Sequence, residues 1–475
     1  MTNSESPEPS SVVSQKLAAQ LSRQLEDEIS SRRWPIGAVL GSEIELQQRF
    51  GVSRSILREA VRLLEHCRVA RMRPGPGGGL VVCEPDASTA TRSLVIYLEY
   101  MGVTVEQLVD ARLILEPLAG RLTAETMTEA GIELLRKTVR AEYDATDDPN
   151  FLSHESFHVR LASLSGNPLL KLLTDVSTTL TGRYLQTSPC ATATSSARAH
   201  LTDAVSHADI TDAVVAGDGA AAHTRLVAHL EVVKARMLAE HIHQSSVHMR
   251  NRPVDPDPQP MLKRFEVVAG QIHADITMGD WRVGDILGSE SDLMVRYGVG
   301  RAVLREALHI LEHHSVARMR RGPGGGLVIL APDPTASFRT IALYLDYHRS
   351  GAAHRHVVRQ AIELGCIRII TAGRIAPEAT DRLRTALDHD ATQNDSGERF
   401  HTALAAVAGN PILTLFIDII DVLAAYDDRR ERTQTTRCPH HLRENHENIL
   451  SAIVDGDEAL AQHRMRKHWA DLANF

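Results

Sequence analysis

The chain has 475 residues, of which 43% are hydrophobic and 24% charged, and its formal net charge is −8. This length predicts about three or four domains with folded cores. The acidic balance argues against a protein that coats nucleic acid indiscriminately, although a net charge averages over domains and can conceal a local basic patch.

The sequence shows no signal for export or for a membrane span. Five widely spaced cysteines without a C-x-x-C pair indicate reduced thiols and no thiolate zinc site. The N-terminal stretch MTNSESPEPSS lacks the apolar core of a signal peptide, and no run of about 18 apolar residues occurs. We therefore expect a cytoplasmic protein without a membrane partner.

One stretch of the chain occurs twice. Residues 37–86 align without a gap to residues 284–333, at an offset of 247, and 31 of the 50 positions are identical. This period is too long for a solenoid unit, so each repeat is large enough to form one or two domains. The chain is therefore an internal duplication, and the two copies of this stretch are called copy one and copy two.

Composition marks the joints between the expected domains. Residues 1–11 are rich in Ser, Pro and Glu, and residues 244–260 contain four prolines among polar residues, as in a linker. Aromatic content is only 4%, and long amphipathic segments dominate outside the duplicated stretch. We therefore expect the remainder to be helical.

Copy one begins with a predicted helix–turn–helix. Ser42 and Glu45 have the spacing of a capping box, Gly51 suits a left-handed helix end, and Ser53 caps the next helix. In that second helix, apolar residues fall at core spacing, while arginines recur every four residues on another face: Arg54, Arg58 and Arg62. Such a stripe suits a helix in the major groove, where arginine bonds guanine or phosphate.

A β-hairpin with a glycine-rich tip is predicted next. Residues 69–72 and 80–82 flank the turn at 74–79, and Arg71 and Arg73 lie beside it. A glycine tip can approach phosphates or the minor groove closely because it has no side chains. Residues 53–73 contain six arginines against two glutamates, so the patch has a local surplus of +4 although the chain is acidic.

Less specific explanations exist for each of these signals. Helix–turn–helix patterns are common in proteins that bind no DNA, and a charged stripe is usually a solvated face. The glycine run could cradle a nucleotide phosphate, but no Lys-Ser or Lys-Thr follows it, and the helix precedes it. The combination, present twice, favours DNA binding.

The run from Gly41 through GVSRSILREAVRLLE to GPGGGL resembles the winged helix-turn-helix of GntR-family bacterial transcription regulators, and copy two resembles it equally. In that family the arginines of the S-R-x-x-x-R-E-A pattern and the wing glycines contact operator DNA. The resemblance implies this role for Arg54, Arg58, Gly78, Arg301, Arg305 and Gly325. We add Ser53, Ser55, Arg73 and Arg320 to the predicted DNA-binding set because they flank these positions.

Both copies depart from the family pattern. The usual Pro-Ser-Glu-Arg opening is Gly-Ser-Glu-Ile at 41–44 and Gly-Ser-Glu-Ser at 288–291, so each copy lacks one phosphate-binding arginine. Copy two also has Gly300 and Ala302 where copy one has serines. We expect copy two to bind DNA more weakly or to recognise a slightly different half-site.

A helical sensor is predicted after each hairpin. Thr104 and Gln107 form a second capping-box pattern, and Arg112 precedes Glu116 by one helical turn, as Arg359 precedes Glu363. Residues 154–170 match residues 397–413 at an offset of 243, and each half ends with two histidines 22 residues apart. This pattern resembles the FCD ligand-binding domain of the FadR subfamily, which makes Arg112 and Arg359 candidate ligand-binding residues.

Histidines at helical spacing point to a metal site in each sensor. His154 and His158 are separated by four residues and would share one helix face, which suits two ligands of one ion. Neutral imidazoles suit a divalent metal such as zinc or nickel, and an open position would hold a small carboxylate. A lone histidine is more often a surface or capping residue, and this chain has 24 of them. The predicted ligands are His154, His158, His207 and His229 in the first sensor and His401, His446 and His468 in the second.

The first ligand of the family is normally an aspartate four residues before the helix histidine. His154 and Gly397 stand at that position, and Asp395 lies too close in sequence to replace it without local distortion. We therefore expect metal binding to be weaker in the second sensor, and the first to be the better sensor.

These patterns predict a mainly α chain with two winged helix-turn-helix domains, each followed by an all-α helical-bundle sensor. The expected boundaries are 12–85 and 86–243 for the first half, 244–260 for the linker, and 261–332 and 333–475 for the second half. Because family members dimerise to meet two half-sites, we expect one chain to form an intramolecular pseudo-dimer, with further dimerisation open.

The expected function is a ligand-responsive transcription regulator, most commonly a repressor, that binds a palindromic double-stranded operator and senses a small organic acid. One alternative is an architectural DNA-binding protein with degenerate sensors. A metal-dependent enzyme is a weaker alternative, because no general base of distinctive spacing accompanies the histidines.

Overall fold

The computed structural model describes most of the chain, namely residues 9–75, 77–144, 157–186, 193–244, 264–279, 281–313, 316–320, 322, 324–373, 375–393, 398–431 and 441–473. These residues form two compact units. The first unit comprises Met1–Ala90 with Ser337–Gly351, and the second comprises Thr91–Ala336 with Ala352–Phe475.

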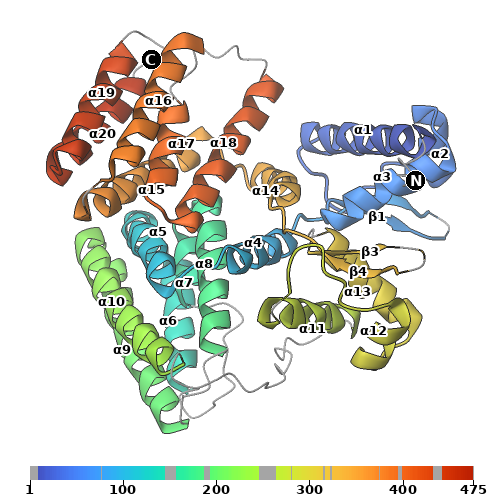
Figure 1. Ribbon diagram of the computed structural model, residues 1–475, viewed down its shortest axis with the longest axis horizontal. Coiled ribbons are helices and arrows are strands. Elements are labelled where there is room, and N and C mark those ends of the chain that lie inside the picture. Colours follow the sequence, from blue (N-terminus) through green and yellow to red (C-terminus); the bar gives the residue numbers. More distant parts are fainter. Residues whose placement is uncertain are drawn as a thin grey trace. The chain divides into compact units, whose positions relative to one another are not determined.

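Each half of the chain begins with a three-helix domain that carries a two-stranded hairpin (Figure 1). In the first half its elements are α1 (Pro9–Ser31), α2 (Glu43–Phe50), α3 (Arg54–His66), β1 (Ala70–Arg73) and β2 (Gly79–Val82). In the second half they are α11 (Arg264–Met278), α12 (Glu290–Tyr297), α13 (Arg301–His313), β3 (Ala317–Arg320) and β4 (Gly326–Ile329). The predicted winged fold is confirmed in both halves.

The local signals in copy one act as predicted. The Ser42 hydroxyl accepts a hydrogen bond from the Glu45 amide at 3.3 Å, and Glu45 Oε2 accepts one from the Ser42 amide at 2.8 Å. Gly51 ends α2 at φ 61°, and the Ser53 hydroxyl accepts from the Ile56 amide at the start of α3. The turn between α2 and α3 is therefore fixed by side chains that are adjacent in sequence.

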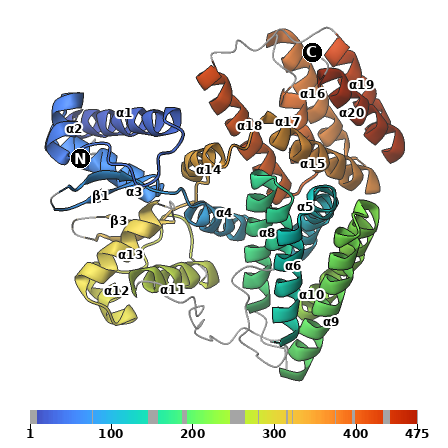
Figure 2. The same cartoon turned by 180° about the vertical axis from the view of Figure 1, so that it is seen from behind.

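A helical bundle follows each winged domain (Figure 2). The first bundle consists of α5 (Val105–Thr126), α6 (Glu129–Asp144), α7 (Phe157–Leu164), α8 (Pro168–Gln186), α9 (Ala193–Val215) and α10 (Gly219–Gln244). The second consists of α15 (Ala352–Ala372), α16 (Pro377–Gln393), α17 (Glu398–Val407), α18 (Pro411–Glu431), α19 (His441–Val454) and α20 (Glu458–Ala473). Helices α5 and α15 lie at the centres of their bundles, where they contact several neighbouring helices.

A linker helix joins each winged domain to its bundle: α4 (Ser88–Tyr100) in the first half and α14 (Thr335–Tyr347) in the second. Helix α14 packs with the winged domain of the first half, where Leu343 is part of the core. Arg339 forms an ion pair with Glu26 at 2.5 Å, and the Trp34 indole donates to Asp346 at 2.9 Å. A helix from the second half thus completes the core of the first winged domain.

Helix α4 makes the corresponding contact in the second unit. Ile96 is buried in one core with Ile272 and Leu304 of the second winged domain. His273 of α11 lies 4.0 Å from the Glu99 carboxylate of α4. The two linker helices are therefore exchanged between the halves.

The predicted boundaries after residues 85 and 332 assign both helices to the sensors, and these boundaries stay predictions.

The two bundles contact each other within the second unit through equivalent residues. The Asn410 side chain donates to the Gln107 carbonyl at 2.8 Å, and the Asn167 side chain donates to the His354 carbonyl at 3.0 Å. Asn167 corresponds to Asn410 at the offset of 243, and Gln107 to His354 at the offset of 247. Such reciprocal contacts are the mark of a two-fold interface.

Among the described helices, none combines the length and the apolar character that a membrane span requires.

The exchanged helix generates a stability prediction. We expect Leu343→Ala to cost roughly 2–5 kcal/mol, because it leaves a cavity in the core of the first winged domain. Hydrogen exchange should then accelerate in α3 more than in α13, although residue 343 belongs to the second half of the sequence. The matched variant Ile96→Ala should accelerate exchange in α13 instead, and the opposite assignment would contradict the exchange of helices.

Candidate DNA-binding surfaces and metal centres

The predicted arginine stripe lies on an exposed face of α3. The side chains of Arg54 and Arg58 are 64% and 59% exposed, and both guanidinium groups bind the Glu43 carboxylate, at 2.9 and 3.1 Å. In the second half, Glu290 binds Arg305 at 2.9 Å and lies 3.6 Å from Arg301. Helices α3 and α13 therefore each present an arginine pair around one carboxylate from the preceding helix.

Glu43 and Glu290 were not singled out from the sequence, where they appeared only as part of the helix start. Hydrogen bonding from Arg54 lowers the pKa of the Glu43 carboxyl, and the same contact raises the pKa of Arg54. Both groups stay charged at neutral pH. The arginines of α3 are therefore already paired with an anion, the Glu43 carboxylate.

The remaining predicted DNA-binding residues lie on the same surface or in the hairpin. The Arg73 guanidinium donates to the Gly77 carbonyl at 2.9 Å, and Arg320 donates to Gly324 in the same way. Ser55 is exposed, and the Ser53 hydroxyl is occupied as a helix cap. Gly300 stands at the position of Ser53 in copy two and has no hydroxyl to provide this cap.

The wing glycines have a structural role that the sequence did not indicate. A Cβ on Gly78 would lie 2.2 Å from the Arg73 carbonyl oxygen, and one on Gly325 would lie 2.2 Å from the Arg320 carbonyl oxygen. Both positions exclude a side chain because the hairpin folds tightly on itself. Their predicted contact with DNA remains a prediction.

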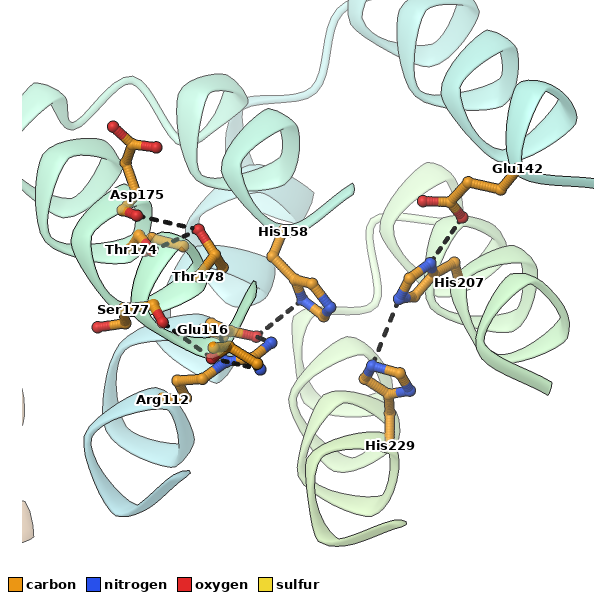
Figure 3. A network of polar contacts seen from close by, with 11 residues as sticks. Arg112, Glu116, Glu142, His158, Thr174, Asp175, Ser177, Thr178, His207 and His229 are labelled. Carbon is orange, nitrogen blue, oxygen red and sulfur yellow. Dashed lines mark hydrogen bonds and ion pairs between the residues drawn. The ribbon is translucent and has the colours of Figure 1, made fainter. Parts of the chain in front are cut away.

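Three buried histidines converge in the first bundle (Figure 3). His158 comes from α7, His207 from α9 and His229 from α10, and their ligand atoms all lie within 4.8 Å of one another. The Nε2 atoms of His207 and His229 are 3.3 Å apart. Tetrahedral nitrogen ligands at zinc distances of about 2.0–2.1 Å are also about 3.3 Å apart, so these side chains fit a metal ion.

The second bundle repeats this arrangement. His401, His446 and His468 come from α17, α19 and α20, and their ligand atoms also lie within 4.8 Å of one another. The Nε2 atoms of His446 and His468 are 3.2 Å apart, and those of His468 and His401 are 3.3 Å apart. Phe157 stacks on His207 and Phe400 on His446, with ring centroids 4.1 and 4.6 Å apart, so an aromatic ring orients one imidazole in each triad.

Carboxylates hold the outer nitrogens of these imidazoles. His158 Nδ1 lies 2.7 Å from Glu116, His207 Nδ1 lies 2.7 Å from Glu142, and His401 Nδ1 lies 3.1 Å from Glu363. Such contacts leave Nε2 directed at the shared centre, as in carboxylate–histidine–metal arrangements. The sequence placed Glu116 and Glu363 near an arginine but did not predict their contacts with histidines.

Burial favours the neutral form of four triad histidines. It lowers the pKa of His158, His229 and His446, and it lowers the pKa of His468 to about 3, with the neighbouring histidines adding to the effect in His229, His446 and His468. Burial by itself would raise the pKa of the Glu363 carboxyl, but His401 and Arg359 outweigh it and lower that pKa to about 2. Neutral imidazoles beside ionised carboxylates are the protonation state that a metal requires.

The two predicted ligand-binding arginines are buried beside the triads. Arg112 is 3% exposed and binds Glu116 at 2.5 Å, while Arg359 is 7% exposed and binds Glu363 at 2.9 Å. One glutamate thus joins the arginine and a histidine in each bundle.

The fourth predicted ligand of the first site, His154, lies outside the described residues, as do Gly397 and Asp395 at the corresponding place in the second. In both bundles the ligand atoms of the three described histidines lie within 4.8 Å of one another. The expectation that the second site is weaker therefore depends on the fourth position alone, and it stays a prediction.

Family models match both halves of the chain. The model described as "Bacterial regulatory proteins, gntR family" matches residues 17–79 and 265–326, and the model described as "FCD domain" matches residues 107–232 and 356–471. Together they cover both winged domains and both bundles.

Curated relatives each match between about a third and just under half of the chain. The HTH-type transcriptional regulator LutR of Bacillus subtilis is 31% identical over 42% of this chain and 90% of its own length. The HTH-type transcriptional repressor NanR of Cronobacter sakazakii is 26% identical over 44% of this chain and 84% of its own length. A further relative, from Mycobacterium gastri, is 29% identical over 32% of this chain and 58% of its own length.

A solved structure described as Streptococcus agalactiae GntR is 27% identical, with a TM-score of 0.33, and it covers 46% of this chain and 99% of its own.

Proposed function

Because this chain belongs to the GntR family of bacterial regulatory proteins and carries an FCD domain in each half, we propose that it represses transcription from a palindromic operator and releases that operator on binding a small organic acid. The observation that carries the sensing part of this proposal is the convergence of a histidine triad, a carboxylate and a buried arginine in each bundle.

The DNA-binding part of the proposal rests on the arginine pairs of α3 and α13. Each pair is exposed and already binds a carboxylate, Glu43 or Glu290, so its donors are arranged for an anionic oxygen. Phosphate oxygens or guanine acceptors of an operator would take the same donors. The neighbouring wing would add backbone contacts through its glycine tip.

Two features support one chain per operator. The bundles contact each other through the reciprocal pairs Asn410–Gln107 and Asn167–His354, and a relative such as LutR corresponds along 90% of its length to less than half of this chain. One chain therefore carries what two subunits would supply in a single-copy regulator. The exchanged linker helices α4 and α14 would connect each sensor to the winged domain of the other half.

In the proposed sensor, each histidine triad holds one metal ion. His158, His207 and His229 would hold a divalent ion such as zinc or nickel in the first bundle, and His401, His446 and His468 would hold one in the second. A bound metal would supply a positive centre with an open position for a carboxylate oxygen. The protein itself holds the histidine rings through Glu116 and Glu363 and places Arg112 and Arg359 nearby.

Stoichiometry with DNA tests the assembly. Selection of bound duplexes from random DNA, with and without metal, would first supply an operator. Sedimentation with one palindrome should then show one chain per duplex, and a requirement for two chains would exclude the intramolecular pseudo-dimer. Binding to every duplex alike, with no advantage for the selected sequence, would instead favour an architectural protein.

Unequal contributions of the two winged domains form a second prediction. Arg58→Ala should weaken operator binding by about 1–3 kcal/mol, since one arginine contact is lost. Arg305→Ala should cost less, because α13 lacks the hydroxyls of Ser53 and Ser55. Fluorescence anisotropy at one fixed salt concentration would measure both, and equal losses would count against divergence of the domains.

Metal content forms a third prediction. The purified chain reconstituted with zinc should retain an ion in each triad, and His229→Ala or His468→Ala should each remove one. Elemental analysis after gel filtration measures this directly. Because a ligand that binds only the folded state stabilises it, chelation should also lower the melting temperature. No loss of metal in either variant would refute the assignment.

A further inference from the structure

The two bundles carry different side chains on the helix that packs beside the buried arginine. Helices α8 and α18 correspond at the offset of 243. Four positions that carry hydroxyl groups in α8 carry apolar or acidic groups in α18: Thr174, Ser177, Thr178 and Thr181 correspond to Ile417, Ile420, Asp421 and Ala424. Three of these hydroxyl residues and both isoleucines are buried, so the substitution changes the interior and not the surface.

In the first bundle a hydroxyl group is the second partner of the arginine. Arg112 uses Nε and Nη2 to bind Glu116 (Figure 3). Its Nη1 donates to the Thr181 hydroxyl at 3.3 Å. The Thr174 hydroxyl is fully buried and contacts no hydrogen-bonding group of the described residues. A buried hydroxyl without a partner is rare, and a ligand oxygen would satisfy it.

In the second bundle a second carboxylate holds the arginine. Arg359 Nη1 binds Asp421 Oδ1 at 2.6 Å while its Nε binds Glu363 at 2.9 Å. Thr402 donates to the other oxygen of Asp421 at 2.9 Å, and the Trp469 indole donates to Glu363 at 2.8 Å. Two carboxylates therefore bind the Arg359 guanidinium group, whereas Glu116 is the one carboxylate that binds Arg112 among the described residues.

The consequence for a ligand follows from charge. An incoming carboxylate at Arg112 replaces a hydroxyl, which is a neutral and weaker partner than a carboxylate. At Arg359 the same ligand would have to displace Asp421, and it would then lie beside a nearby like charge that it repels. The Arg359–Asp421 ion pair thus already occupies the position at which a ligand carboxylate would bind the arginine.

From these contacts we propose that the two bundles accept different ligands, with a hydroxylated carboxylate binding beside Arg112 and Asp421 closing the second bundle to acids. This inference rests on the proposed function, because it takes the triad and its arginine as the effector site. One chain would then bind one acid effector, although it contains two FCD domains.

Isothermal titration of the zinc-reconstituted full chain with sodium gluconate, a carboxylate rich in hydroxyl groups, tests this directly. The wild-type chain should bind gluconate at one site and Asp421→Thr at two, with the second site the weaker because Ile417, Ile420 and Ala424 still lack the hydroxyl groups of the first bundle. The matched control is Thr402→Val, which keeps Asp421 and introduces the residue that the first bundle has at Val159. It should bind at one site only.

The reciprocal variant Thr178→Asp places the acid in the first bundle and should weaken the wild-type site by at least about tenfold. It also keeps the proposal testable if Asp421→Thr fails to fold. Two gluconate sites in the wild-type chain, or no effect of either reciprocal substitution, would overturn the inference while leaving the proposed regulator intact. No binding by any of these proteins would overturn both the inference and the carboxylate effector on which it rests.

Discussion

A single buried carboxylate organises the centre of each bundle. Glu116 is 1% exposed, and its two oxygens bind Arg112 of the same helix and His158 of α7. Removing one partner from such a buried pair would leave an uncompensated charge, which typically costs about 3–5 kcal/mol. The carboxylate thereby fixes an arginine and an imidazole at once and aims the free nitrogen of the imidazole at the other two histidines. Glu363 does the same for Arg359 and His401.

The duplication has placed two equivalent bundles, and the contacts between them, within one chain. Reciprocal hydrogen bonds from Asn167 and Asn410 join the bundles, and each winged-domain core contains a residue from the other half, Leu343 or Ile96. In a dimer of identical subunits, one mutation changes both symmetry-related copies of such a contact, because one gene encodes both subunits. Here each member of a pair can change alone, so a duplicated regulator can keep its architecture while its two sites diverge.

One difference between the two bundles lies at the partner of the buried arginine. The histidine triads share one spacing, with Nε2 separations of 3.3 and 3.2 Å for the pair 22 residues apart. The partner of the buried arginine, by contrast, changes from the hydroxyl of Thr181 to the carboxylate of Asp421. A charge interacts more strongly in the protein interior than in water, so this change bears directly on which ligands each site can accept.

The sequence by itself determined the winged helix-turn-helix domains with their capping residues Ser42 and Ser53, the cap Thr104 of the bundle helix α5, and the histidines of both triads. These features follow from local spacing or from the duplication, and both can be read along the chain. Only the tertiary structure decided which glutamates hold the histidines, that Glu43 lies between two arginines, that Asp421 reaches Arg359, and that α4 and α14 are exchanged. Each of these joins residues that come together only when helices pack, and no periodicity in the sequence encodes which side chain across the interface will meet a buried charge.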